Sequence, residues 1–190
     1  VEAIAAPDFT SLAQELLATN RRNCRLLRME DHLPPRALAH VELRAVRGGV
    51  LIQTIDRGDP HDAQWRVVTK RAPSDTEMNA LRFAWNAVQA VKSNAIVIAN
   101  AQTTLGIGGG LPSRVDAARL AVGKAGEKAH GAVMASDAFF PFADGLQVGA
   151  EAGITAVIAP GGSVRDADVI AAADEADIAM IFTGIRHFRH

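Results

Sequence analysis

Cysteine is almost absent from this chain of 190 residues, in which Cys24 is the single thiol. One thiol can form neither an internal disulfide nor a cysteine-based zinc site. The chain also lacks an apolar run of about 18 residues, which a membrane-spanning helix needs. The sequence that begins at Val1 resembles a strand, and it has neither the basic segment nor the long apolar segment of a signal peptide. We therefore expect a cytoplasmic protein whose chain begins within a longer polypeptide.

An excess of charge of either sign is absent as well. The 20 basic and 21 acidic residues give a formal net charge of -1. Proteins that bind nucleic acid or anionic membranes usually carry an excess of Lys and Arg, so we expect neither partner. The hydrophobic fraction of 48% and charged fraction of 22% are ordinary for a globular protein and suit one domain over residues 1–190.

The first third of the chain is expected to form short strands around one helix. Asp8 or Thr10 can cap that helix, which should run to about Leu17, and Gly48-Gly49 should turn a hairpin. The expected strands are 1–6, 24–27, 41–46 and 50–53, and the expected loops are 29–40 and 56–64.

Clearer signals follow Pro73. Ser74 and Glu77 form a capping box, in which each side chain bonds an otherwise unpaired backbone amide. Met78, Leu81, Trp85 and Val88 then mark one face of a helix. Strand 95–99 should pair with strand 103–107. The elements expected after this pair are, in order, a helix from Ser113, strand 132–135, helix 143–152, strand 155–159, helix 164–176 and strand 178–182. This alternation predicts an α/β fold: a mixed, mostly parallel sheet in a three-layer α/β/α arrangement.

Three stretches follow predicted strands and lead into helices, where ligands bind in open α/β sheets. Residues 108–114 and 160–165 place glycines and a serine before a helix and carry Arg114 and Arg165 at their ends. Free amides at such helix starts favour negative charge or carbonyl oxygens. The alternative is an ordinary tight turn with a helix cap.

The third stretch, residues 136–144, gathers Phe139, Phe140 and Phe142 next to Asp144. Aromatic walls beside a carboxylate suit a flat heteroaromatic ligand with paired N–H donors, such as a pterin. Alternatively, these phenylalanines are core residues and Asp137 and Asp144 are helix caps.

Isolated polar residues complete the set of candidates. Asn94 could bind a ligand carboxamide or tie two loops together. Arg186, in the basic segment 186–190, could fold back onto a phosphate or belong to a solvated tail. Lys70 and Arg71 are interpreted as surface charges.

Two partial motifs do not carry the chemistry that they suggest. His40-Val41-Glu42 matches half of a zinc deaminase signature, but the Pro-Cys-x-x-Cys half is absent. Gly106–Gly110 is not followed by Gly-Lys-Ser/Thr and is no P-loop. We expect no zinc.

Six collinear motifs resemble the C-terminal section of the bifunctional AICAR transformylase/IMP cyclohydrolase family, and softer similarity covers the rest of the chain. The motifs are Val91-Lys-Ser-Asn-Ala-Ile96, Gly106-Ile-Gly108, Ser113-Arg114, Ala135-Ser-Asp-Ala-Phe-Phe-Pro-Phe142, Pro160-Gly-Gly-Ser163 and Arg186-His-Phe-Arg-His190. The resemblance implies a cytidine-deaminase-like α/β/α fold without zinc. It also implies transfer of a formyl group from 10-formyltetrahydrofolate to AICAR in purine synthesis.

The same resemblance implies roles for individual residues. Its AICAR-contacting positions match Asn94, Arg114, Phe139 and Arg186. Its folate-contacting positions match Val115, Asp144, Ser163 and Val164. It further implies a homodimer with sites formed where subunits meet, and a monovalent cation such as K+ near the C-terminus.

The chain departs from the family pattern at several points. The family's catalytic Lys-His pair lies upstream of residue 1, as does its cyclohydrolase domain, so we assign no catalytic residue here and expect the chain alone to be inactive. Leu111-Pro112 and Ala143 replace polar residues, which affects nucleotide positioning and charge near the folate. Two alternatives remain: a non-catalytic module that binds folate or nucleotide, and a metal-dependent deaminase.

Overall fold

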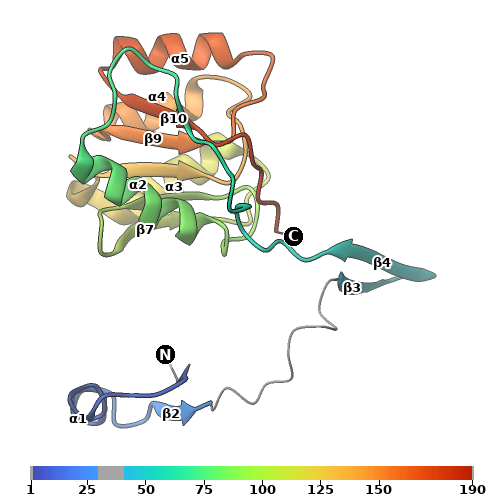
Figure 1. Cartoon of the computed structure of the whole chain (residues 1–190), viewed down its shortest axis with the longest axis vertical. Coiled ribbons are helices and arrows are strands. Elements are labelled where there is room, and N and C mark those ends of the chain that lie inside the picture. The colour runs from blue at the N-terminus through green and yellow to red at the C-terminus, as the bar shows by residue number, and fades with distance from the viewer. Residues whose placement is uncertain (1, 30–40, 190) are drawn as a thin grey trace. The chain divides into compact units, whose positions relative to one another are not determined.

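The computed structural model describes residues 2–29 and 41–189, and its contacts divide the chain into two compact units, 1–55 and 56–190 (Figure 1). The expected loop at 29–40 lies outside the described residues except for its first residue, Met29. His40, the first residue of the deaminase-like motif, also lies outside them. No helix among the described residues is long and apolar enough to cross a membrane. The assignment of the whole chain to one domain stays a prediction.

The first unit contains the predicted helix and strands. Helix α1 (Ser11–Asn20) begins at Thr10, whose hydroxyl accepts a hydrogen bond from the Ala13 amide at 3.2 Å. It connects β1 (Ala3–Ala6) to β2 (Arg25–Arg28), which are parallel. Strands β3 (Val41–Val46) and β4 (Gly49–Thr54) form the predicted antiparallel hairpin. Gly48 in its turn has a φ of 83°, a left-handed conformation that glycine adopts without strain.

The second unit contains a six-stranded mixed sheet, as predicted, with the strand order β5-β10-β9-β8-β6-β7. Only β8, β9 and β10 pair in parallel, so the sheet is less parallel than expected. The physical reason is that the β6–β7 hairpin forms one end of the sheet, with β6 antiparallel to β8, and that β5 pairs antiparallel with β10 at the other end. The strands are β5 (Arg66–Val67), β6 (Ile96–Ala99), β7 (Thr104–Gly108), β8 (Val133–Ser136), β9 (Ala156–Ala159) and β10 (Ala179–Phe182).

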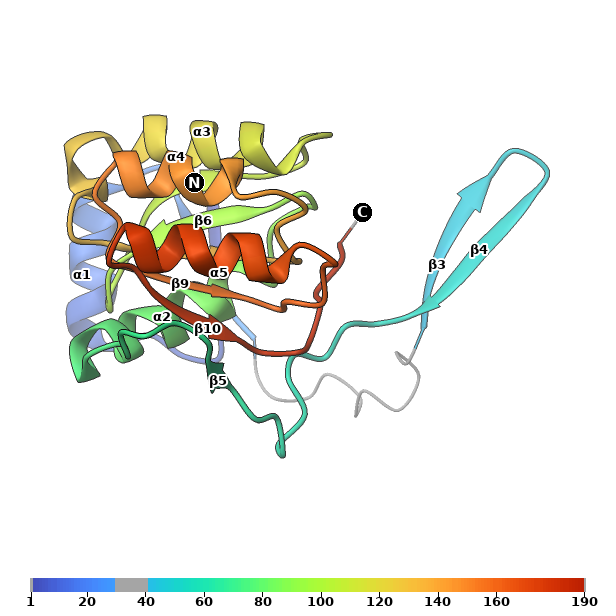
Figure 2. The ribbon, with the colours of Figure 1, turned by 90° about the horizontal axis from the view of Figure 1, so that it is seen from above.

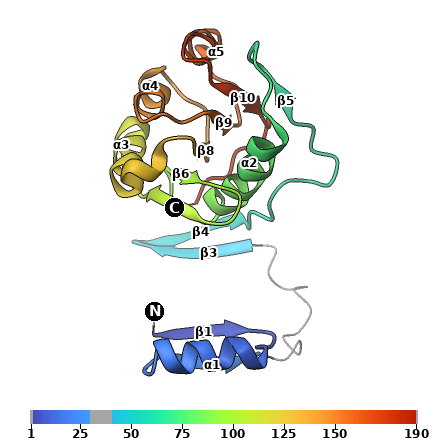
Figure 3. The same cartoon turned by 90° about the vertical axis from the view of Figure 1, so that its left-hand side faces the viewer.

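Helices cover both faces of this sheet (Figures 2 and 3). Because successive strand side chains point to opposite faces, Ile96 and Ile98 pack toward one core and Val97 and Ala99 toward the other. The first core also contains buried residues of α3 (Arg114–Ala125), α4 (Asp144–Glu151) and α5 (Asp166–Glu175). The second contains those of α2 (Asp75–Val88).

The strand directions bring distant loops to one edge of the sheet. Strands β7, β8, β9 and β10 all run the same way, so their carboxyl ends lie along a single edge. Strand β6 runs in the opposite sense and contributes its amino end there. The segments 92–95, 109–113, 137–143, 160–165 and 183–189 therefore all start or finish at this edge.

Two glycines seat helix α3 directly on strand β7. A Cβ atom at Gly106 would fall against the carbonyl oxygen of Ala121, and one at Gly108 against that of Ala117. The absence of side chains lets the helix lie against the strand backbone. This contact sets the position of the first turn of α3, which begins at Arg114.

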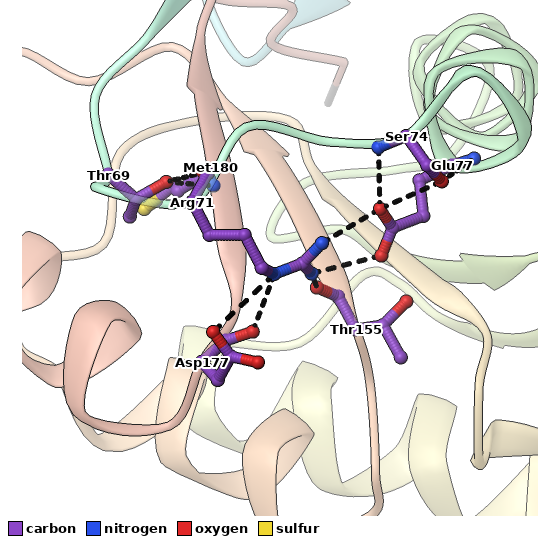
Figure 4. Close-up of polar contacts among 7 residues, drawn as sticks. All are labelled: Thr69, Arg71, Ser74, Glu77, Thr155, Asp177 and Met180. Carbon is purple, nitrogen blue, oxygen red and sulfur yellow. Dashed lines mark hydrogen bonds and ion pairs between the residues drawn. The ribbon is translucent and has the colours of Figure 1, made fainter.

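Arg71 is not the surface charge that its sequence neighbourhood suggested (Figure 4). Its guanidinium forms two parallel hydrogen bonds to Glu77, at 2.9 and 3.0 Å, and also donates to the backbone oxygens of Thr155 and Asp177. The hydrogen bond with Glu77 raises the pKa of Arg71. This cluster ties the start of α2 to the segments that precede β9 and β10.

The pKa of Glu77 falls to about 2 from an ordinary value of 4.5. Burial alone raises this pKa, but hydrogen bonds from Arg71 and from the Ser74 amide outweigh that effect. A carboxyl whose folded-state pKa is depressed stabilises the fold above its ordinary pKa. That stability is lost as the pH falls toward 2.

We predict that Glu77→Gln lowers the free energy of unfolding at pH 6 by about 2 kcal/mol, the scale of hydrogen bonds to charged groups. The difference from the wild type should shrink as the pH falls from about 5 toward 2. Urea denaturation across this pH range measures it. Glu127→Gln, an exposed carboxylate, is the control and should change stability by less than about 0.5 kcal/mol. A difference that does not depend on pH would contradict the assignment.

Candidate functional site

The candidate site is centred on Arg114, the first residue of α3. Ser113 caps this helix by accepting a hydrogen bond from the Asp116 amide. The Arg114 guanidinium donates to Asp137 at 2.5 Å, to Ser136 at 2.8 Å and to the side-chain oxygen of Asn94 at 2.8 Å. The Arg114 residue is 8% exposed. The three acceptors come from the end of β8 and the start of β6, so this side chain joins both strands to the helix.

Asp137 balances the charge of Arg114 in the interior. It is fully buried, and its carboxylate also accepts hydrogen bonds from the Ser93 hydroxyl at 2.5 Å and the Ala95 amide at 3.1 Å. A buried charge is tolerated only when it is paired and hydrogen-bonded, and both conditions hold here. Asp137 is therefore a buried ion-pair partner rather than a helix cap.

Asn94 ties two loops together, one of the two roles considered for it. Its side-chain amide donates to the Leu111 carbonyl oxygen at 2.9 Å, and the Asn94 backbone amide donates to the same oxygen. The side-chain oxygen meanwhile accepts from Arg114. Both ends of the carboxamide are thus engaged, which fixes the orientation of the group at the edge of the sheet.

A cavity of about 470 Å³ opens beside this network. That volume lies within the usual range for ligand pockets, roughly 300–1,000 Å³. Five of the residues named from the sequence line it together: Asn94, Arg114, Val115, Phe139 and Asp144. The remaining lining is mostly apolar and includes Pro112, Pro141, Phe142 and Phe188.

The three phenylalanines after β8 have different environments. Phe140 is 2% exposed and belongs to the core, which matches the alternative interpretation for that residue. Phe139 is half-buried and Phe142 is exposed, and both line the cavity. Asp144, the first residue of α4, is exposed, and one of its carboxylate oxygens accepts a hydrogen bond from the Gly145 amide at 2.7 Å.

The turn that contains Ser163 and Val164 is not part of the cavity lining. The amides of Gly162 and Ser163 already donate to Asp166, at 2.7 and 3.1 Å, so they are less available to a ligand than the sequence suggested. Val164 is fully exposed. Arg165 links this turn to the cavity because its guanidinium lies 5.2 Å from the Phe142 ring centre.

The C-terminal segment folds back onto the same edge. The Arg186 guanidinium lies over the Phe139 ring, 5.7 Å from its centre, although Arg186 itself is not part of the lining. Arg189 is anchored by its backbone, which donates to the Ser93 hydroxyl and accepts from the Ser93 amide. The segment is therefore an ordered part of the site.

Sequence reasoning did not identify Ser93, Ser136 and His187 as parts of this site. Ser93 and Ser136 bond the Arg114–Asp137 pair, and His187 is 1% exposed and bonded to two aspartates. All three residues lie inside motifs that were noted, but no periodicity distinguishes a buried histidine from a solvated one. No group of three or more His, Cys, Asp or Glu side chains is arranged for a metal ion within residues 2–29 and 41–189.

The comparisons with known proteins agree on one family. Residues 1–124 match the family model described as AICARFT/IMPCHase bienzyme. Proteins called "Bifunctional purine biosynthesis protein PurH" are similar to the whole chain: it is 52% identical to that of Magnetococcus marinus, 50% to that of Streptococcus thermophilus and 56% to that of Chloroflexus aurantiacus. The chain spans about 37% of the length of each of these relatives.

We predict that Arg114→Met lowers the free energy of unfolding by about 3–5 kcal/mol, because it leaves Asp137 charged and buried without its partner. The matched control is Arg119→Met on the same helix. Arg119 forms an exposed ion pair with Asp116 at 3.0 Å, and its loss should change stability by less than about 1 kcal/mol. Chemical denaturation of both variants tests the difference, and equal effects would refute the structural role of the buried pair.

Proposed function

Because the chain belongs to the AICARFT/IMPCHase bienzyme family, we propose that it is the C-terminal portion of a phosphoribosylaminoimidazolecarboxamide (AICAR) formyltransferase. In the proposed reaction the exocyclic amine of AICAR attacks the formyl carbon of 10-formyltetrahydrofolate. The bond from that carbon to the folate nitrogen breaks, and the amine loses a proton. The whole enzyme would also carry IMP cyclohydrolase, which closes the formylated product to IMP in purine biosynthesis.

The observation that supports this function is one cavity lined by two kinds of group. Asn94 and Arg114 contribute polar groups, whereas Val115, Phe139 and Phe142 provide apolar and aromatic surface. Formyl transfer requires two ligands to lie against each other, and positioning supplies much of the rate of such reactions. A pocket that joins a polar and an aromatic surface can bind a nucleotide next to a folate.

The nucleotide is assigned to the polar groups. Asn94 and Arg114 are held in place by their mutual hydrogen bond, so they offer a rigid surface to the imidazole carboxamide. Phe139 can stack on the ring. Arg186 is exposed at the edge of this surface, where its guanidinium can donate two hydrogen bonds to the phosphate.

The folate is assigned to Val115, the second residue of α3, and to Asp144, the first residue of α4. Val115 and Asp144 both line the cavity, and Asp144 keeps one carboxylate oxygen free of any hydrogen bond to Gly145. That oxygen can accept from the N–H edge of the pterin. Ser163 and Val164 are assigned to a more distant part of the folate, since they lie outside the cavity lining.

Several parts of the proposal concern the enzyme beyond this chain. The general base, a Lys-His pair in the family, would lie upstream, and a homodimer would complete each site. A monovalent cation such as K+ would bind near the C-terminus, and zinc would have no role in this cytidine-deaminase-like fold. The enzyme would act in the cytoplasm on small molecules, without nucleic acid or membrane as partners.

We predict opposite ligand selectivity for two variants in an enzyme of the relatives' full length that carries this chain. Arg186→Ala should weaken AICAR binding by about tenfold to a hundredfold, because it removes a charged donor to the phosphate. Asp144→Ala should weaken folate binding more than AICAR binding. Isothermal titration calorimetry with each ligand separately measures both effects.

Matched controls distinguish local contacts from general charge effects. Arg189→Ala removes the same charge three residues from Arg186, and Asp168→Ala removes an exposed carboxylate from α5. Both controls should bind the two ligands as the wild type does. An unchanged AICAR affinity in Arg186→Ala would remove this residue from the site, and equal loss of both ligands in Asp144→Ala would refute the folate assignment.

We also expect the 190-residue chain alone to show negligible formyl transfer, because it would supply positioning groups without the general base. The assay follows release of tetrahydrofolate from 10-formyltetrahydrofolate in the presence of AICAR, with a full-length relative as the positive control. Measurable turnover by the chain alone would show that it contains its own proton acceptor.

A further inference from the structure

A buried histidine with two carboxylate partners lies behind the candidate site. The Nδ1 atom of His187 is 2.7 Å from a carboxylate oxygen of Asp56, and its Nε2 atom is 2.9 Å from one of Asp59. The imidazole is 1% exposed, and its ring lies edge-on to that of Trp85, with 5.0 Å between the ring centres. The proposed function uses none of these four residues.

The partners of His187 are themselves held in place. The second carboxylate oxygen of Asp59 accepts hydrogen bonds from the indole nitrogens of Trp85, at 2.9 Å, and Trp65, at 3.2 Å. Asp56 accepts from the Gly58 amide with its other oxygen. Each ring nitrogen of His187 lies within hydrogen-bond distance of one carboxylate, which fixes the orientation of the imidazole.

The neighbours of His187 in the chain reach the candidate site. Arg186, before it, lies over the Phe139 ring, and Phe188, after it, lines the cavity. The His187 amide donates to the Asp137 carbonyl oxygen at 3.1 Å, and the Arg189 amide donates to the Ser93 hydroxyl at 3.1 Å. The imidazole contacts Asp56, Asp59 and Trp85, none of which lines the cavity, whereas Phe188 lines it and Arg186 lies over a residue that does.

We propose that His187 is a positioning residue: its imidazole, bound between Asp56 and Asp59, fixes residues 186–189 so that Arg186 and Phe188 are held at the nucleotide end of the cavity. The proposal rests on the proposed function for the identity of the ligand. An arginine loses the freedom of several rotatable bonds when it binds a phosphate, and it loses more if its backbone is also unfixed beforehand. Fixing its backbone in advance reduces that loss and strengthens binding.

The test combines amide hydrogen exchange with AICAR titration in an enzyme of the relatives' full length that carries this chain. Two variants break the clamp, defined as His187 bound between Asp56 and Asp59. His187→Ala removes the imidazole itself. Asp56→Ala removes the more exposed of the two carboxylates, so folding is less affected. Asp62→Ala is the matched control, because it removes an exposed carboxylate from the same loop. We expect the His187 and Arg189 amides to exchange at least about tenfold faster in both clamp variants, and AICAR affinity to fall about tenfold, equivalent to about 1.4 kcal/mol.

A purely structural role would give a different pattern, in which exchange accelerates throughout the unit, including at the β9 and β10 amides. Faster exchange confined to residues 187–189 together with weaker AICAR binding supports positioning. Unchanged exchange at His187 and Arg189, or unchanged AICAR affinity despite faster exchange, overturns it. If His187→Ala does not fold, Asp56→Ala decides the question alone. A wild-type enzyme that does not bind AICAR contradicts the proposed function, whereas the exchange rates still decide whether His187 and its partners order the segment.

Discussion

The buried ion pair between Arg114 and Asp137 is the constraint on which the candidate site depends. Removing two charges from water is unfavourable by several kcal/mol each, so the pair persists only because the buried side-chain nitrogen and oxygen atoms around it, among the described residues, have hydrogen-bond partners. Supplying those partners requires β6, β8 and α3 to meet at one point. The local structure of this edge of the sheet is therefore set by electrostatics as much as by apolar packing. The cavity lies next to the point where β6, β8 and α3 meet around the ion pair.

This pairing also determines which charges a ligand meets. Arg114 directs its guanidinium to Asp137, Ser136 and Asn94, so it contributes hydrogen-bonding direction but little net charge. The exposed charges near the cavity include Asp144, Arg186 over Phe139 and Arg165 over Phe142. The carboxylate and the two arginines come from different segments and have opposite sign. Such a separation gives a polar ligand a preferred orientation before any close contact forms.

Much of the fold could be predicted from local patterns, and much of the site could not. The Ser74 capping box, the Gly48 hairpin and the α/β alternation each depend on residues a few positions apart. The mixed sheet follows from the same patterns, whereas the antiparallel pairing of β6 with β8 depends on which strand of the hairpin joins the rest of the sheet. The partners of Arg114 and His187 lie 20 to 131 positions away in the sequence. Periodicity carries no information at that range, so Asp137 resembled a helix cap and Arg71 a solvated charge.

The close seating of α3 on β7 gives two residues outside the cavity lining control over its dimensions. Gly106 and Gly108 face the helix backbone, and any larger side chain there would push the helix outward together with Arg114 and Val115 at its start. Attempts to enlarge or narrow the pocket need not alter the residues that touch a ligand. A larger side chain under the helix would shift one wall of the cavity as a rigid body. These two strand positions are therefore suitable sites for changing the width of the pocket by design.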